Sequence, residues 1–146
     1  MPTLSRCFLR GGLVCLAVGI LFGGVLLLHK GTGWLPWAWV LLPAHIYLVL
    51  IGGISQVTLG VCYWIFPRFG GGASRGRSWF AWGSYAVLNA ALGLVICHPL
   101  IELLLGAVTA TWAFAAAGML QGLAALAFVL HIWPRIRASA ATPRRA

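Results

Sequence analysis

Four long apolar stretches, separated by short polar or glycine-rich segments, make up most of this 146-residue chain. They cover approximately residues 11–28, 43–66, 79–97 and 103–133. An α-helix needs about 20 predominantly apolar residues to cross the hydrocarbon core of a bilayer, and all four stretches are close to that length or longer. The pattern therefore predicts an all-α integral membrane protein, a four-helix bundle that occupies a single domain, residues 1–134.

Composition agrees with this interpretation and narrows the function classes. Hydrophobic residues form 62% of the chain and charged residues only 8%, whereas a soluble domain has about 25% charged residues. The single acidic residue, Glu102, disfavours a pump that relays protons through a series of carboxylates. The net charge of +9 is concentrated at the ends of the apolar stretches. It therefore indicates membrane topology, with the lipid bilayer as partner and no nucleic acid.

The basic residues predict how the spans are oriented. In an up-down-up-down bundle every arginine falls on one side of the membrane, and the only lysine, Lys30, falls on the other. The arginines are Arg6, Arg10, Arg68, Arg75, Arg77, Arg135, Arg137, Arg144 and Arg145. Because positive residues are retained on the cytoplasmic side, we expect a multi-pass protein of the bacterial inner membrane with both termini cytoplasmic. Residues 135–146 are expected to form a basic, flexible tail.

The second apolar stretch carries the strongest candidate chemistry. Its histidine, His45, lies in an apolar run, where an ionisable group is costly and is a functional-site hypothesis by default. The helix could begin near Pro36 or at Pro43, since proline suits the first helical turn. We prefer Pro43, because the residues from there to 66 still span the hydrocarbon. The tryptophans before Pro43 would then form an interfacial segment.

The expected topology sorts the four histidines by side. His29, His45 and His98 lie toward the non-cytoplasmic surface, and His131 lies toward the cytoplasm. A bis-histidine heme needs two imidazoles at similar depth, and helix-bundle cores commonly supply them. A helix start at Pro43 brings His45 level with His98, so these two are the predicted ligands of a heme iron. His29 and His131 are secondary candidates, and His131 cannot share a heme with His45 inside one chain.

Small and polar residues of the second stretch leave alternatives open. Gly52 and Gly53 leave one face of the helix without side chains. This face could leave room for a porphyrin, in which case the two glycines are cofactor-binding residues. It could also let another helix pack closely. Gln56 and Gln121 are expected to hydrogen-bond between the second and fourth spans. These two spans also end alike, in WIFPR and HIWPR. Two tandem helical hairpins would give this echo, and so would convergence on the same interface anchors.

The pattern of His45, Gly52, Gly60, Tyr63 and Pro67 resembles the second helix of the heme–copper oxidase catalytic subunit, whose superfamily includes the nitric oxide reductases. In that family the histidine of this helix is an axial ligand of the low-spin heme on the non-cytoplasmic side. The chain also resembles short four-helix bacterial membrane proteins that look like fragments of that subunit. The later helices with the remaining heme and copper ligands have no counterpart among the four stretches. The resemblance therefore implies a role for His45 and no oxygen- or nitric-oxide-reducing centre.

Together these features predict a b-type heme-binding electron-transfer subunit of a respiratory or redox complex, with one low-spin heme near the non-cytoplasmic face. No nucleophile, acid–base pair or metal-cluster motif indicates standalone catalysis. The expected partners are other membrane subunits, with a quinol or a periplasmic electron carrier as redox partner. The alternative hypothesis is a structural or assembly subunit without a cofactor, and a small transporter or sensor is a third.

Overall fold

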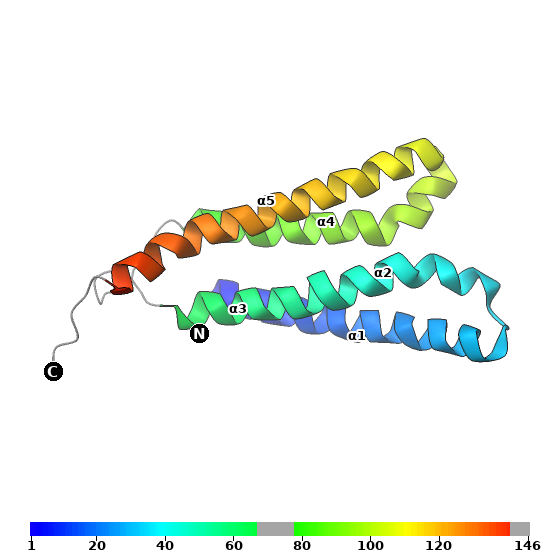
Figure 1. Cartoon of the computed structure of the whole chain (residues 1–146), viewed down its shortest axis with the longest axis horizontal. Helices are drawn as coiled ribbons and strands as arrows, with labels where there is room; N and C mark the ends of the chain where they lie inside the picture. Colours follow the sequence, from blue (N-terminus) through cyan, green and yellow to red (C-terminus); the bar gives the residue numbers. More distant parts are fainter. Residues whose placement is uncertain (67–77, 141–146) are drawn as a thin grey trace.

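The structure, a computed structural model, describes residues 1–66 and 78–140. Regular structure within these residues is helical throughout. The helices long and apolar enough to cross a membrane are Thr3–Thr32, Pro36–Ile65, Ser78–Leu105 and Ala107–Arg137. They lie as two helical hairpins (Figure 1). The predictions of an all-α protein and of four helices of membrane-spanning length are confirmed.

The first hairpin joins α1 (Thr3–Thr32) to an irregular second helix. α1 ends at Gly33, which adopts a φ of 72° and donates its N–H to the carbonyl of His29 at 2.7 Å. The second helix consists of η1 (Pro36–Leu41, a 3-10 helix), α2 (Leu42–Tyr47), η2 (Leu48–Ser55, a π-helix) and α3 (Gln56–Ile65). Pro43 lies in the first turn of α2, but the helical span as a whole begins at Pro36. The preferred start at Pro43 is therefore wrong, and the other expected start, near Pro36, is the one that the structure has. The tryptophan segment before Pro43 is already helical.

The second hairpin consists of α4 (Ser78–Leu105) and α5 (Ala107–Ala140). Gly106 separates the two helices with a φ of 88°, a left-handed conformation that residues with a side chain adopt only at a cost. Its N–H donates to the carbonyl of Glu102 at 3.0 Å and so closes the end of α4. A single glycine is therefore enough to turn the chain between two long helices.

Two helices continue past the ends that we expected at residues 97 and 133. α4 runs through Pro99 and α5 runs through Pro134. Proline removes one backbone donor, but neighbouring groups make up for this loss in membrane helices. The expectation of a flexible tail is therefore wrong for residues 135–140, which are helical. The rest of the expected tail, residues 141–146, lies outside the described part of the chain.

α1 packs against the second helix through small residues. An added Cβ at Gly12, Gly19 or Gly60 would come within 2.7–2.8 Å of an atom of the facing helix. Such close approach is typical of membrane helices that associate. Ser5 reinforces it by donating its hydroxyl to the carbonyl of Gly60 at 2.6 Å. The first turns of α1 take part in this packing, which is why the helix begins earlier than the expected 11–28.

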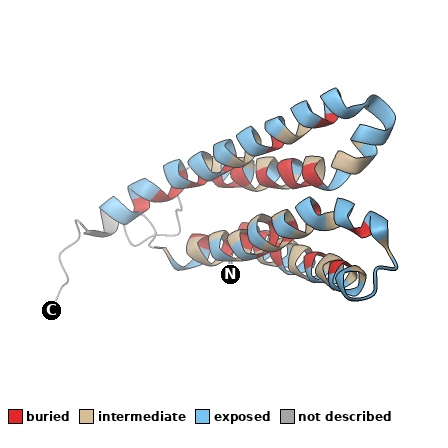
Figure 2. Ribbon diagram, turned by 45° about the vertical axis from the view of Figure 1, so that its right-hand side comes forward, coloured by how far each residue is buried: buried red, intermediate tan, exposed pale blue. Residues whose placement is uncertain are grey.

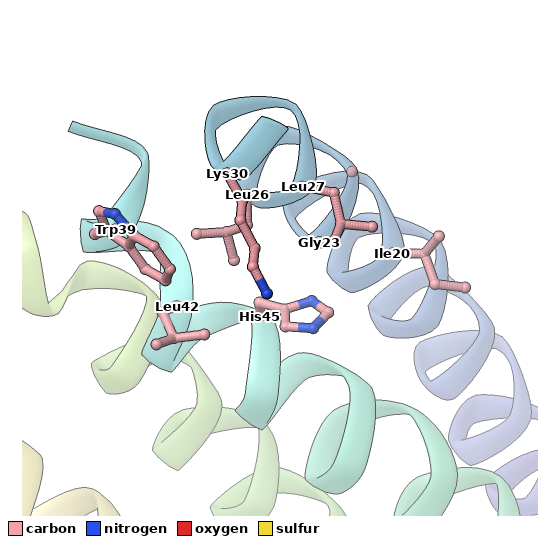
Figure 3. A pocket seen from close by; sticks show the side chains of 9 residues that line it. Ile20, Gly23, Leu26, Leu27, Lys30, Trp39, Leu42 and His45 are labelled. Carbon is pink, nitrogen blue, oxygen red and sulfur yellow. The ribbon is translucent and has the colours of Figure 1, made fainter. Parts of the chain in front are cut away.

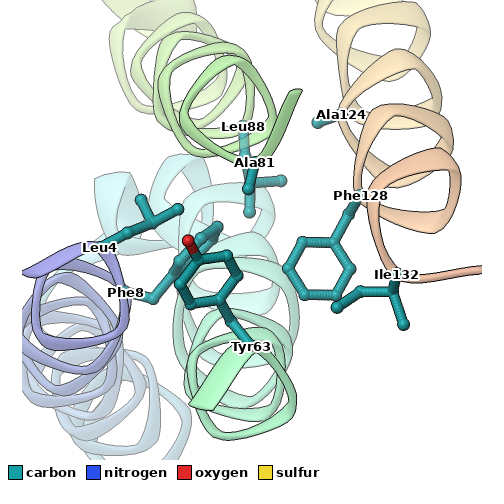
Figure 4. Packing of buried hydrophobic residues seen from close by; sticks show 8 residues of the cluster. All are labelled: Leu4, Phe8, Tyr63, Ala81, Leu88, Ala124, Phe128 and Ile132. Carbon is teal, nitrogen blue, oxygen red and sulfur yellow. The ribbon is translucent and has the colours of Figure 1, made fainter. Parts of the chain in front are cut away.

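The two hairpins meet in an apolar core near the first turns of α1 (Figure 4). The ring of Phe8 makes edge-to-face contacts with Tyr85 and Phe128, with centroids 5.0 Å and 6.0 Å apart. The buried members of this core are Leu4, Phe8, Tyr63, Ala81, Leu88, Ala124, Phe128 and Ile132. Large apolar side chains are exposed on the outer faces of both hairpins (Figure 2), as surfaces in contact with lipid would be.

Arg135 joins α5 to the end of α3. Its buried guanidinium donates to the carbonyls of Tyr63 and Phe66, groups that a helix end leaves without an intrahelical partner. The guanidinium lies 5.5 Å from the centroid of the Tyr63 ring, and His131 stacks on that ring at 5.4 Å. The similar ends of the second and fourth spans thus meet here. We call Arg135, Tyr63, Phe66 and His131 the Arg135 clasp.

Candidate functional site

His45 lies on α2 and faces α1. Its Nδ1 is 2.7 Å from the carbonyl oxygen of Gly19. Because a carbonyl oxygen can only accept, Nδ1 carries the proton, and a neutral imidazole then keeps its lone pair on Nε2. The ring lies directly against Gly23, where an added Cβ would come within 2.6 Å of the imidazole Cε1. The absence of a side chain at Gly23 is therefore what lets the imidazole approach α1.

A pocket of about 530 Å³ opens beside His45, between α1 and the start of the second helix (Figure 3). Ile20, Leu26 and Leu27 line it from α1, and aromatic and aliphatic side chains line it from the second helix. The side chain of Lys30 reaches toward His45 within it, and the imidazole of His45 extends toward α1 (Figure 3). The pocket thus combines apolar walls, one cation and one imidazole, and its volume is in the range of small-molecule and cofactor sites.

His98, the second predicted ligand, lies on the other hairpin. Its ring contacts Phe114 of α5 edge-to-face at 5.3 Å between centroids, and Phe114 in turn contacts Tyr47 of α2 at 5.6 Å. His45 precedes Tyr47 by two residues and faces α1 instead. His98 is therefore not among the residues that line the pocket beside His45.

The two secondary candidates, His29 on α1 and His131 on α5, contact opposite ends of the second helix. His29 contacts Trp39 edge-to-face at 5.8 Å between centroids, and Trp39 is one of the residues that line the pocket beside His45. His131 belongs to the Arg135 clasp. Of the two, only His29 is near the pocket.

Gly52 and Gly53 face α1 and are buried. An added Cβ at Gly52 would come within 2.8 Å of the Cβ of Cys15, and one at Gly53 would clash with Leu16. Side chains of α1 therefore fill the space in front of both glycines. This geometry supports close helix packing, and it corrects the assignment of the two glycines as cofactor-binding residues.

The polar residues of the second helix have different partners from those expected. Gln56 is fully buried and donates its amide to Oδ1 of Asn89 on α4 at 3.1 Å, and Asn89 donates to the carbonyl of Tyr85 at 2.8 Å. The expected bond between Gln56 and Gln121 is wrong.

The polar residues of the second helix could be identified from the sequence, but the π-helix η2 could not. Its eight residues form a π-helix, a rare feature that is frequent at functional sites.

The described residues contain no group of three or more His, Cys, Asp or Glu side chains that could hold a metal ion. A heme iron takes only one or two axial ligands from the protein. The pocket beside His45 offers one imidazole with a fixed tautomer, apolar walls and a lysine. An imidazole with a free lone pair and apolar walls are the features that a heme iron would need from the protein.

Comparisons of this chain with models of known protein families, with curated protein sequences and with solved structures find no match. The resemblance of the second helix to the heme–copper oxidase family stays a prediction. A functional assignment therefore depends on the chemistry of the pocket beside His45.

Proposed function

We propose that this chain is a membrane b-type heme-binding electron-transfer subunit in which His45 is an axial ligand. The observation that carries the proposal is the hydrogen bond from Nδ1 of His45 to the carbonyl of Gly19. Histidines that ligate metals almost always donate their other ring N–H to a carbonyl, a carboxylate or water, which fixes the tautomer and the ring orientation. The bond leaves Nε2 of His45 as the ligating atom.

The rest of the pocket supports the same class of ligand. Its walls are mostly apolar, and the ammonium of Lys30 can pair with a carboxylate side chain of a b-type heme. A bound heme would supply one-electron exchange at its iron. The chain itself would supply the imidazole, the apolar surroundings and the positive charge, which are the features that tune a heme's reduction potential.

Within the part of the chain that the structure describes, His45 is the histidine that would hold a heme in this pocket. His98 would have to leave its contact with Phe114 to reach the pocket beside His45. We therefore propose that another chain of a respiratory or redox complex supplies the second axial ligand. Other membrane subunits are the proposed partners, and a quinol or a periplasmic carrier is the proposed electron donor.

In this proposal the protein is an up-down-up-down four-helix bundle of the bacterial inner membrane with cytoplasmic termini. The arginines among the described residues support this orientation, because they lie near the start of α1 and the end of α5. They are Arg6, Arg10, Arg135 and Arg137. Arg68, Arg75, Arg77 and the last two arginines lie outside the described residues. The pocket beside His45 then lies toward the non-cytoplasmic face.

One observation favours the alternative, a structural or assembly subunit without a cofactor. The hydrogen bond to Gly19 and the contact with Gly23 also suit a histidine that only ties α2 to α1. A structural histidine of this kind would need no free Nε2. The two functions therefore differ in whether the purified protein carries heme and whether that heme depends on His45.

The test compares the heme content of the wild-type protein with that of His45→Ala and His98→Ala, all purified from cells with an ample heme supply. We expect His45→Ala to lose nearly all of its Soret absorbance and His98→Ala to keep it, with both variants helical by circular dichroism. Full heme content in His45→Ala would exclude His45 as a ligand. Loss of heme in His98→Ala alone would assign the ligand to the second hairpin.

A further inference from the structure

A groove runs between the second helix and α5. It consists of two adjoining hollows of about 370 Å³ and 260 Å³, which share Ile51 and Gln121. Residues of η2 and α3 form one wall, residues of α5 form the other, and most of the lining side chains are apolar. We call this feature the Gln121 groove. It is separate from the pocket beside His45, with which it shares no lining residue.

The amide of Gln121 gives the groove a specific chemistry. Its Nε2 is buried and has no hydrogen-bond partner among the residues that the structure describes. A buried donor without a partner is costly, above all in the hydrocarbon region, where water cannot take the missing place. The groove is therefore suited to a ligand that brings a hydrogen-bond acceptor.

Two hydroxyl groups of the groove add hydrogen-bond acceptors to the donor that Gln121 provides. Ser55 donates its hydroxyl proton to the carbonyl of Leu50 at 2.9 Å, and Thr58 donates its own to the carbonyl of Ile54 at 2.8 Å. Both residues line the Gln121 groove. A hydroxyl oxygen that donates its proton can still accept a hydrogen bond. The groove thus offers one donor and two acceptors in apolar surroundings.

The depth of Gln121 in the membrane limits which class of ligand the groove can bind. Gln121 lies near the middle of the apolar span Ala107–Arg137, about 20 Å from either end at about 1.5 Å per residue. The ester carbonyls of phospholipids lie in the polar regions outside the hydrocarbon core and do not reach this depth. Acyl chains reach it but carry no acceptor. A lipid-soluble quinone has both the ring carbonyls and an apolar tail.

We propose that the Gln121 groove binds the ring of a lipid-soluble quinone. Nε2 of Gln121 donates to a ring carbonyl of the oxidised form, and the hydroxyl oxygen of Ser55 accepts from a ring hydroxyl of the reduced form. This binding deepens the electron-transfer function proposed above, because it gives the lipid-soluble redox partner a site. The binding itself needs no heme, so the two proposals are tested separately.

The test measures how much decylubiquinone the protein retains in quinone-free lipid nanodiscs, relative to nanodiscs without protein. We expect saturable binding by the wild-type protein, and binding weaker by about tenfold in Gln121→Leu, which loses the donor. Ala125→Phe keeps the donor and fills the groove, and it is expected to block binding. The matched control is Thr111→Val, because Thr111 is exposed on α5 and donates its hydroxyl to the carbonyl of Ala107 within its own helix.

Three results would overturn the quinone site. They are wild-type binding no greater than that of empty nanodiscs, wild-type affinity in both Gln121→Leu and Ala125→Phe, and equal displacement of decylubiquinone by hexadecane, which has no acceptor. The variant His45→Ala separates the two proposals, because it is expected to bind decylubiquinone as the wild-type protein does. Quinone binding by a protein that never carries heme would contradict the heme proposal and leave the Gln121 groove in place.

Discussion

At the scale of single residues, the position of His45 depends on the glycines that face it from α1. The ring lies against Gly23, whereas the next residue, Gly24, has open space where a Cβ would lie. His45 could be identified from the sequence because a histidine is costly in an apolar run. Its contacts with Gly19 and Gly23 could not be identified, since they depend on how two helices are rotated and shifted against each other.

The difference between Gly23 and Gly24 gives a prediction about single substitutions. Gly23→Ala should force the imidazole away from α1, lower the stability of the protein by about 1–3 kcal/mol, as overpacking typically does, and reduce its heme content severalfold. Gly24→Ala is the matched control and should leave both quantities unchanged. The measurements are thermal unfolding and the ratio of heme to protein. Equal behaviour of the two variants would mean that contact with Gly23 does not position His45.

At the scale of elements, the π-helix η2 is the part of the second helix that the sequence pattern does not predict. Gln56 lies about three α-helical turns after His45, so an unbroken helix would place the two on one face. A π-helix holds more residues per turn and therefore rotates the residues after it about the helix axis. In the structure His45 faces α1, and Gln56 lies between α1 and α4, because its Oε1 lies against Gly11 and its Nε2 donates to Asn89. Hydrophobicity does not reveal a π-helix, because its residues are as apolar as those of the surrounding helix.

The two buried glutamines lead to opposite predictions. Gln56→Leu should destabilise the protein by about 1–3 kcal/mol, because it leaves the partly buried Oδ1 of Asn89 without its donor. Gln121→Leu should be neutral or slightly stabilising, because it removes a buried donor that has no partner among the described residues. Thermal unfolding in detergent measures both. A destabilising Gln121→Leu would show that this amide is already satisfied within the protein.

The Arg135 clasp gives a second prediction at the scale of elements. Arg135→Lys should lower stability by about 1.5–3 kcal/mol, because a lysine cannot reproduce the planar contacts of the guanidinium with the carbonyl of Phe66 and the ring of Tyr63. Arg137→Lys is the control, since Arg137 is exposed and its guanidinium lies over the ring of Trp133 in the same helix. Unfolding temperatures measure the difference, and equal values would mean that the clasp contributes nothing.

At the scale of the whole molecule, the number of helices was predictable because bilayer thickness sets how long an apolar helix must be. The boundaries of the helices were harder to predict, because Pro99 and Pro134 lie inside helices that continue on both sides of them. The predicted pairing of His45 with His98 depends on depth alone. Depth does not say which way a side chain points around the helix axis, and the two rings face different neighbours.

The orientation of the molecule can be tested with reporter fusions. A fluorescent protein that folds only in the cytoplasm should be active at the carboxyl terminus, and a reporter active only outside the cytoplasm should be active after Lys30. The reason is that every arginine lies on the predicted cytoplasmic side. The opposite pattern of activities would invert the topology and move the pocket beside His45 to the cytoplasmic face.

Whether His45 holds a heme decides the proposed function, and the optical spectrum of the purified protein before and after reduction with dithionite tests it without any partner. We predict a Soret band and a reduced α-band in the wild-type protein, present in Gly24→Ala and absent in His45→Ala. A wild-type protein that is folded, was purified from heme-replete cells and shows neither band would contradict heme ligation by His45.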